Sequence, residues 1–187
     1  MQKLSREKAW QLLTTYVDDP SLLQHSLIVE TIMRHFAQLN HADPDVWGIV
    51  GLLHDLDWQR YPEQHCYKTA EILRTAGIDE VYIHAIMSHS YGIDTDVKPS
   101  NLMEKTLFTI DELSGLIVAV TKIIPSHRIN DVKVKSVKKK FNRSTFAAGV
   151  NRNLINQGLA MLNVPLTDII QECLNAMQAN ATALNLN

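Results

Sequence analysis

Apolar residues recur every three or four positions along most of the chain, and no segment alternates apolar and polar residues as a strand would. This spacing is typical of helices that turn one apolar face toward a core. The pattern therefore predicts an all-α protein of about eight or nine helices. We expect helices over about 5–17, 65–76, 80–90, 102–124, 144–162 and 166–179, two more that begin at 20 and at 44, and a frayed tail at 180–187.

Two Asp-Pro pairs mark the starts of two of these helices. Asp19-Pro20 lies in "DDPS", and Asp43-Pro44 lies in "HADPDV". An aspartate can accept hydrogen bonds from the free amides of a first helical turn, and proline suits the first helical position because the amide there has no helical partner. We therefore expect each aspartate to cap a helix that begins at the following proline.

The length of 187 residues and the apolar share of 45% suit one globular domain over 1–187. Eighteen basic and 20 acidic residues give a net charge of −2, which argues against a general affinity for nucleic acid or membranes. Cys66 and Cys173 form neither a CxxC pair nor a disulfide framework, and the longest apolar runs are too short to span a bilayer. These features predict a soluble cytoplasmic protein and leave homo-oligomer formation open.

The most apolar of the predicted helices ends in a histidine and an aspartate, His54 and Asp55. His25 and Asp111 also fall on apolar faces, and His89 ends an apolar stretch. One such histidine is usually a hydrogen-bonded core residue, but several on the inner faces of successive helices are harder to explain in that way. A buried carboxylate costs several kcal/mol unless a strong partner compensates, and a divalent cation is the strongest. Since imidazole and carboxylate ligands suit Fe, Mn, Co, Ni or Zn, the sequence predicts one or two such ions.

The order of these residues resembles a known family. His25, then His54-Asp55, then Asp111 is similar to the H…HD…D signature of the HD-domain metal-dependent phosphohydrolase superfamily. The resemblance covers about residues 20–125, and it implies an all-α fold with the metal between core helices. Residues 126–187 would then be C-terminal helices packed on this core.

Two further segments resemble the branches of that superfamily that bind two metals. The segment "HCYKTAEIL" begins at His65 and resembles their HPxxGAxxL segment, and "AIMSHS" resembles the segment that supplies their next histidine, here His89. The resemblance implies that His65 and His89 bind a second metal and that Asp55 bridges the two ions. The stretch "LLHDLD" is similar to that of a compact bacterial group of predicted HD-superfamily hydrolases.

The chain departs from the family at one informative place. Many HD phosphodiesterases have HDxGK, in which the lysine helps to bind the substrate phosphate. Here the stretch is "HDLDW", with Asp57 at the glycine position and Trp58 at the lysine position. Together with the lack of a GYP-like segment, this argues against a cyclic-dinucleotide phosphodiesterase.

The sequence thus predicts a metal-dependent phosphohydrolase that acts on a small phosphate ester or nucleotide through a metal-activated water. Asp55 and Asp57 are the candidate catalytic residues that orient this water, although Asp57 fits equally well as a hydrogen-bond acceptor for a ligating imidazole or as an acid at the helix end. The alternatives are a di-iron oxygenase of the HD-domain type and a metal-binding regulatory module without catalysis.

A phosphate substrate requires cationic partners near the metal. Lys68 stands one helical turn after His65, and the basic segment 128–143 follows the predicted core. We expect substrate contacts from Lys68, Arg128, Lys133 and Lys139. The ordinary alternative for these lysines is a solvated helix face.

Overall fold

The two Asp-Pro pairs start helices, as predicted. Asp19 accepts hydrogen bonds from the amides of Ser21 and Leu22, and the carboxylate of Asp43 does the same at the next helix start. The computed structural model describes residues 4–187. In them it contains α1 (Arg6–Tyr16), α2 (Pro20–Leu39), α3 (Pro44–Leu53), η1 (Pro62–Gln64), α4 (Tyr67–Thr75), α5 (Glu80–Ser88), α6 (Leu102–Ile123), η2 (Ile129–Asp131), α7 (Val134–Phe141), α8 (Arg152–Leu162) and α9 (Leu166–Ala179).

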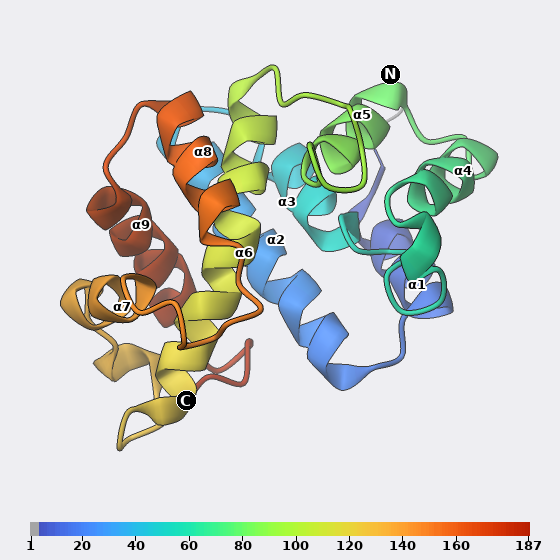
Figure 1. Cartoon of the computed structure of the whole chain (residues 1–187). Coiled ribbons are helices and arrows are strands. Elements are labelled where there is room, and N and C mark those ends of the chain that lie inside the picture. Colours follow the sequence, from blue (N-terminus) through green and yellow to red (C-terminus); the bar gives the residue numbers. More distant parts are fainter. Residues whose placement is uncertain (1–3) are drawn as a thin grey trace.

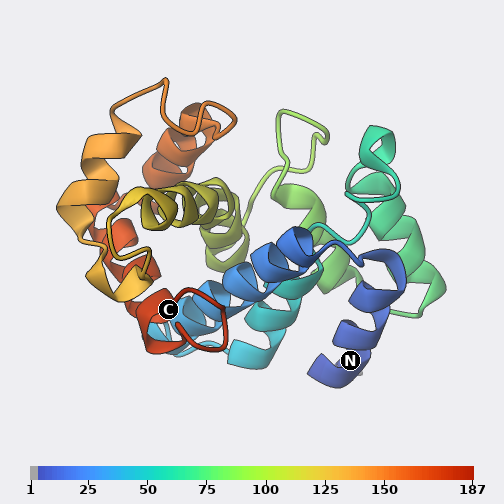
Figure 2. The same ribbon diagram turned by 90° about the horizontal axis from the view of Figure 1, so that it is seen from below.

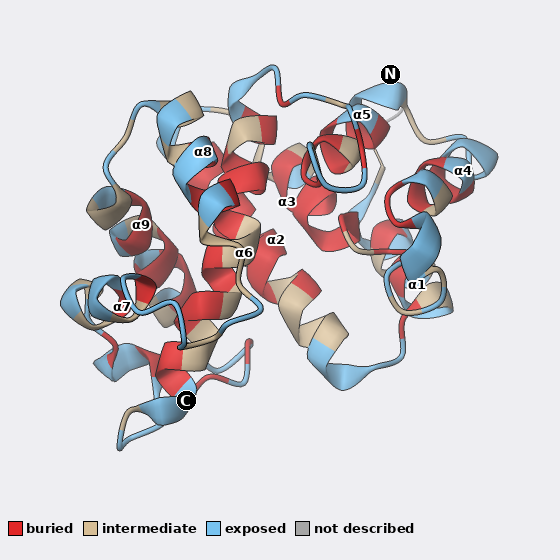
Figure 3. Ribbon diagram, viewed as in Figure 1, coloured by how far each residue is buried: buried red, intermediate tan, exposed pale blue. Residues whose placement is uncertain are grey.

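The nine α-helices of these residues, with no strand among them, confirm the predicted all-α fold (Figure 1). Helices α2 and α3 lie at the centre, with α1 and α5 against α3. On the other side α6 packs against α2, α8 packs on α6, and α9 contacts both α2 and α6. Buried residues gather on the faces that these helices turn toward one another (Figure 3). The resulting core holds the ends of α3 and α5 and the middle of α6 close together.

The predicted helix over 144–162 is shorter in the structure, where α8 begins only at Arg152. The guanidinium of Arg152 explains the difference, because it donates hydrogen bonds to five backbone carbonyls, one at the end of α7 and four in the loop that follows. These acceptors belong to Phe141, Arg143, Phe146, Ala147 and Val150. In this loop the carbonyls of Arg143 and Ala147 accept from the amides of Phe146 and Val150, three residues on, as in turns and not as in an α-helix. The prediction for 144–151 was therefore wrong.

The tail 180–187 is not frayed, and that prediction was also wrong. Ala181, Leu184 and Leu186 are buried, and Leu186 accepts a hydrogen bond from the amide of Ile129 at 2.8 Å. Gln24 on α2 donates to the carbonyl of Leu184, so the tail lies beside α2 (Figure 2). Burial of these apolar side chains outweighs the entropy lost on ordering the tail. No helix within 4–187 is long and apolar enough to cross a membrane.

Candidate metal centre

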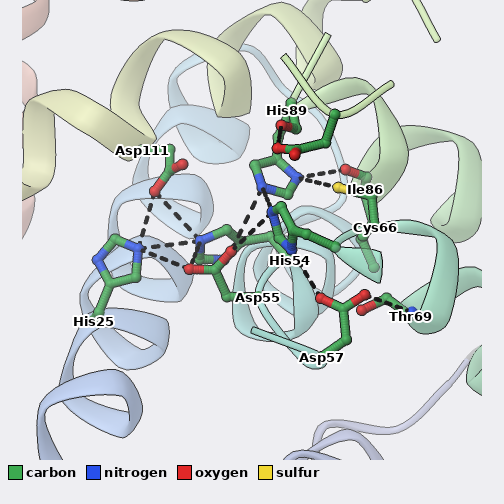
Figure 4. A network of polar contacts seen from close by, with 12 residues as sticks. His25, His54, Asp55, Asp57, Cys66, Thr69, Ile86, His89 and Asp111 are labelled. Carbon is green, nitrogen blue, oxygen red and sulfur yellow. Dashed lines mark hydrogen bonds and ion pairs between the residues drawn. The ribbon is translucent and has the colours of Figure 1, made fainter. Parts of the chain in front are cut away.

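Six side chains from separate parts of the fold converge in one place, and five of them are labelled in Figure 4. His25 lies on α2 and Asp111 on α6, while His54 and His89 stand directly after the last residues of α3 and α5. Asp55 follows His54, and His65 follows η1. The structure therefore brings together all six residues for which a metal role is predicted.

The first group of ligand atoms lies between α2, α3 and α6. The Nε2 atoms of His25 and His54 are 3.1 Å apart, and Asp111 Oδ1 lies 2.9 and 3.3 Å from them. Asp55 Oδ2 completes the group at 3.3 Å from His54 Nε2 and 3.6 Å from His25 Nε2. Ligands about 2.1 Å from one ion are themselves about 3.0–3.4 Å apart, so these separations fit a common ion.

The second group lies on the other side of Asp55. The Nε2 atoms of His65 and His89 are 3.2 Å apart. Asp55 Oδ1 lies 3.6 Å from the first and 3.5 Å from the second. The two oxygens of one carboxylate therefore face two different pairs of imidazoles, which is the arrangement of a bridging ligand.

Hydrogen bonds on the far side of each ring determine which nitrogen faces the centre. The Nδ1 atom of His54 donates to the carbonyl of Gly51 at 2.8 Å, and that of His89 donates to the carbonyl of Ile86 at 2.6 Å. His65 Nδ1 donates to Asp57 Oδ1 at 2.8 Å. Since carbonyls and carboxylates only accept, the neutral rings present lone pairs at Nε2. Lone pairs 3.2 Å apart repel unless a proton or a metal ion lies between them, so this donor set fits two borderline divalent cations.

Three clusters of His, Cys, Asp or Glu in the described residues have the spacing of metal ligands. Cys66 is a buried neighbour of the second group. The Sγ atom of Cys66 lies 3.8 Å from His89 Nδ1, the ring nitrogen that points away from Asp55. The clusters are consistent with metal binding through the imidazole and carboxylate atoms, with the thiol behind the His89 ring.

The electrostatics of the metal-free site favour protons where the cations would lie. Burial lowers the pKa of His54, but the carboxylates of Asp55 and Asp111 outweigh it and raise that pKa to about 10. Burial also lowers the pKa of His65, while the bond to Asp57 raises it to about 9. The neighbouring His54 holds the pKa of Asp55 well below its usual range despite burial.

These raised pKa values predict that protons compete with metal. His54 and His65, with pKa values of about 10 and about 9, hold protons near neutral pH in the metal-free protein. We expect the affinity for Co²⁺ to rise between pH 6 and 9, by about tenfold per pH unit for each proton displaced. Titration followed by the visible absorbance of Co²⁺ measures it. His35 pairs with Glu172 away from this site, so the control variant His35→Ala should show the same rise in Co²⁺ affinity with pH. A pH-independent affinity would contradict the assignment.

Asp57 lies behind His65, away from the central space. It is fully buried, and its two oxygens accept hydrogen bonds from His65 Nδ1 and from the amide of Thr69, each at 2.8 Å. Of the roles considered for this residue, the contacts correspond to the acceptor that orients a ligating imidazole. Asp57 does not line the pocket beside the ligands, and its catalytic role stays a prediction.

Replacing Asp57 with asparagine tests this positioning role. An amide has one acceptor oxygen, so either the His65 imidazole or the amide of Thr69 loses its partner. We expect one of two ions to bind about 10–100-fold more weakly, while the other keeps its affinity. Calorimetric titration with Mn²⁺ resolves the two binding steps. The exposed Asp131→Asn variant serves as the control, and equal loss at both steps would argue against a role specific to His65.

The ligands open into a pocket of about 300 Å³. Side chains that the sequence did not single out for the site also line it: Ser90, Ile93, Asp94, Glu112, Val150 and Leu154. Trp58, which stands where many HD phosphodiesterases have a lysine, lines the pocket as well. Burial raises the pKa of Glu112, while the amide of Asn151 donates to its carboxylate at 3.0 Å and offsets part of that rise. No single sequence periodicity links these positions, because they come from segments far apart in the chain.

The four predicted substrate-binding cations lie outside this lining. Lys68 pairs with Glu71 at 2.8 Å and stands over the ring of Tyr61, in a separate hollow. Arg128 directly precedes η2, Lys133 directly precedes α7, and Lys139 lies within α7. Their part in substrate binding stays a prediction.

Comparison with known proteins agrees with this geometry. Residues 22–116, just over half of the chain, match the HD domain family. Searches among curated proteins and among solved structures found no significant match. The matched range contains all six converging side chains. The chain belongs to the HD domain family, within the HD metal-dependent phosphohydrolase superfamily.

Proposed function

We propose that this protein is a metal-dependent phosphohydrolase that acts on a small phosphate ester or nucleotide. One observation carries the proposal: the two oxygens of Asp55 each face a separate pair of imidazole nitrogens. This arrangement suits two ions held side by side. Two such ions stabilise the attacking and the leaving oxygens of a phosphate hydrolysis and make a water acidic at neutral pH. Membership in the HD domain family supports the same reaction class.

The chain's own residues prepare the site for that chemistry. The carbonyls of Gly51 and Ile86 and the carboxylate of Asp57 hold the Nδ1 hydrogens of three imidazoles, so that each Nε2 points to the centre. Preorganised ligands of this kind need no rearrangement when an ion or substrate binds. Leu154 of α8 and Val150 of the loop before it add apolar surface to the wall of the pocket.

Release of inorganic phosphate from a panel of phosphate monoesters and nucleoside monophosphates, with Mn²⁺ present, tests the proposal. We expect turnover that His54→Ala abolishes, because that imidazole faces both Asp55 and Asp111. The variant Lys138→Ala, on the exposed surface of α7, should retain it. Metal binding without any phosphate release from the panel would contradict a hydrolase and favour a regulatory module.

A di-iron oxygenase is the second candidate. The Asp55 geometry fits it as well, because both ions would have nitrogen ligands. The observation that favours it is that no lysine or arginine lines the pocket within the described residues. Iron in the purified protein, a visible absorption band on oxidation and consumption of dioxygen with a substrate would support this candidate over the hydrolase.

A further inference from the structure

The pocket beside the metal ligands combines an apolar wall with a negative charge. Trp58 and Ile93 line it although 44% and 56% of their surfaces are exposed to solvent. Val150 and Leu154 add apolar surface from another segment. Large apolar side chains left exposed at the rim of a polar site commonly bind the apolar part of a ligand. A volume of about 300 Å³ is at the small end of the range for ligand pockets.

Trp58 is placed to contact a ligand that reaches the ions. Its ring stands edge to face with the imidazole of His65, with the ring centres 4.9 Å apart and the planes at 79°. A group bound at His65 would therefore have the indole beside it. Aromatic rings pair well with the indole, and the pairing adds to the free energy of burial.

The other charged residues of the pocket are both acidic. Asp94 accepts a hydrogen bond from Ser90 Oγ at 2.6 Å, and Glu112 accepts one from the amide of Asn151 at 3.0 Å. These neutral donors position the two carboxylates without cancelling their charge. Neither carboxylate has an ion-pair partner in residues 4–187. No lysine or arginine of the described chain lines the pocket.

The charges set a limit on the substrate. Two divalent ions carry four positive charges, and the carboxylates of Asp55 and Asp111 cancel two of them. The two positive charges that remain balance one phosphate dianion. A second anionic group on the substrate would lie near Asp94 or Glu112 with no cation beside it. Its repulsion from these carboxylates would weaken binding.

We propose that the substrate is a phosphate monoester whose organic part is aromatic or apolar and carries no second anionic group. Trp58 is the side chain that selects the ring. Asp94 and Glu112 are the side chains that exclude further negative charge. This inference rests on the proposed hydrolase function and narrows its substrate class. Esters of di- and triphosphates are excluded by the same charges.

Binding of three phosphonates to the Mn²⁺-loaded protein, measured by calorimetry, tests the inference without turnover. We expect phenylphosphonate to bind about tenfold more tightly than methylphosphonate. Trp58→Ala should bring this ratio close to one, and Trp58→Phe should keep most of it. The control Tyr67→Ala removes an exposed aromatic residue that does not line the pocket, so it should leave the ratio unchanged.

The third probe, 4-carboxyphenylphosphonate, measures the charge selection. We expect it to bind about tenfold more weakly than phenylphosphonate. The double variant Asp94→Asn, Glu112→Gln keeps an acceptor oxygen for both neutral donors and should remove most of that difference. Equal binding of all three probes, with ratios that neither set of variants changes, would overturn the inference.

Hydrolysis separates this outcome from a failure of the proposed function. Equal phosphate release from methyl, phenyl and 4-carboxyphenyl phosphate would leave the hydrolase standing and overturn the substrate class. No release from any of these esters, together with no phosphonate binding, would overturn both.

Discussion

Replacing Asp55 with alanine should remove metal from both halves of the site, because each of its oxygens faces a different pair of imidazoles. Metal content per chain, measured on protein purified with Mn²⁺, should fall from about two ions to less than one. Phosphate release should fall by about 10³-fold, since the ions are expected to contribute several kcal/mol to the transition state.

Thermal unfolding provides a second measurement of the same variant. A metal at about 100 times its dissociation constant stabilises the native state by about 2.7 kcal/mol. For a chain of this length that corresponds to a rise in Tm of about 5–10 °C on adding metal. We expect this rise in the native protein and its loss in Asp55→Ala. Asp168→Ala, at an exposed position of α9, is the matched control and should keep both the metal and the rise. Full metal content in Asp55→Ala would refute the bridging role.

Replacing Gly51 with alanine should damage both stability and metal binding, although glycine carries no functional group. A Cβ atom there would lie 2.9 Å from the carbonyl oxygen of Val29 and 3.1 Å from the amide nitrogen of Glu30, both backbone atoms of α2. Backbone cannot move aside as a flexible side chain can, so α3 must shift away from α2. Overpacking of this kind costs about 1–3 kcal/mol.

The shift would act directly on the ligands. Gly51 accepts the Nδ1 hydrogen of His54, and His54 Nε2 lies 3.1 Å from His25 Nε2 across the contact between α3 and α2. We expect Gly51→Ala to bind Co²⁺ at least about tenfold more weakly, because small displacements of ligands are costly. Gly149→Ala places its Cβ in open space and is the control. If Gly51→Ala lost stability but bound Co²⁺ normally, the close approach of the helices would serve packing alone.

The helices were largely predictable because their signals are local. Asp19-Pro20 and Asp43-Pro44 identified two starts to the residue, since capping depends only on neighbouring amides. Two local patterns were misleading. Residues 144–151 have helical spacing, but the guanidinium of Arg152 binds the carbonyls of Phe146, Ala147 and Val150 in that loop. The tail 180–187 is too short for a periodic signal, and it is ordered by burial of Leu184 and Leu186.

The candidate ligands were visible in the amino-acid order because imidazoles and carboxylates on apolar faces are expensive unless something compensates them. That argument concerns single helices, and so it reaches His25, His54 and Asp111 one at a time. The pocket wall is different in kind. Trp58, Ile93 and Val150 become neighbours only through packing between segments distant in the chain, and nothing in their local patterns marks them.

Chain order therefore specified helices, their starts and the chemical types gathered in the core, all of which follow from interactions between residues a few positions apart. Which oxygen of Asp55 faces which imidazoles, and which cations stay away from the pocket, followed from the three-dimensional packing of α2, α3, α5 and α6. The physical reason is that ligand geometry changes when the distances between atoms on separate helices change by a few tenths of an ångström. Those distances are set by side-chain packing across the whole core.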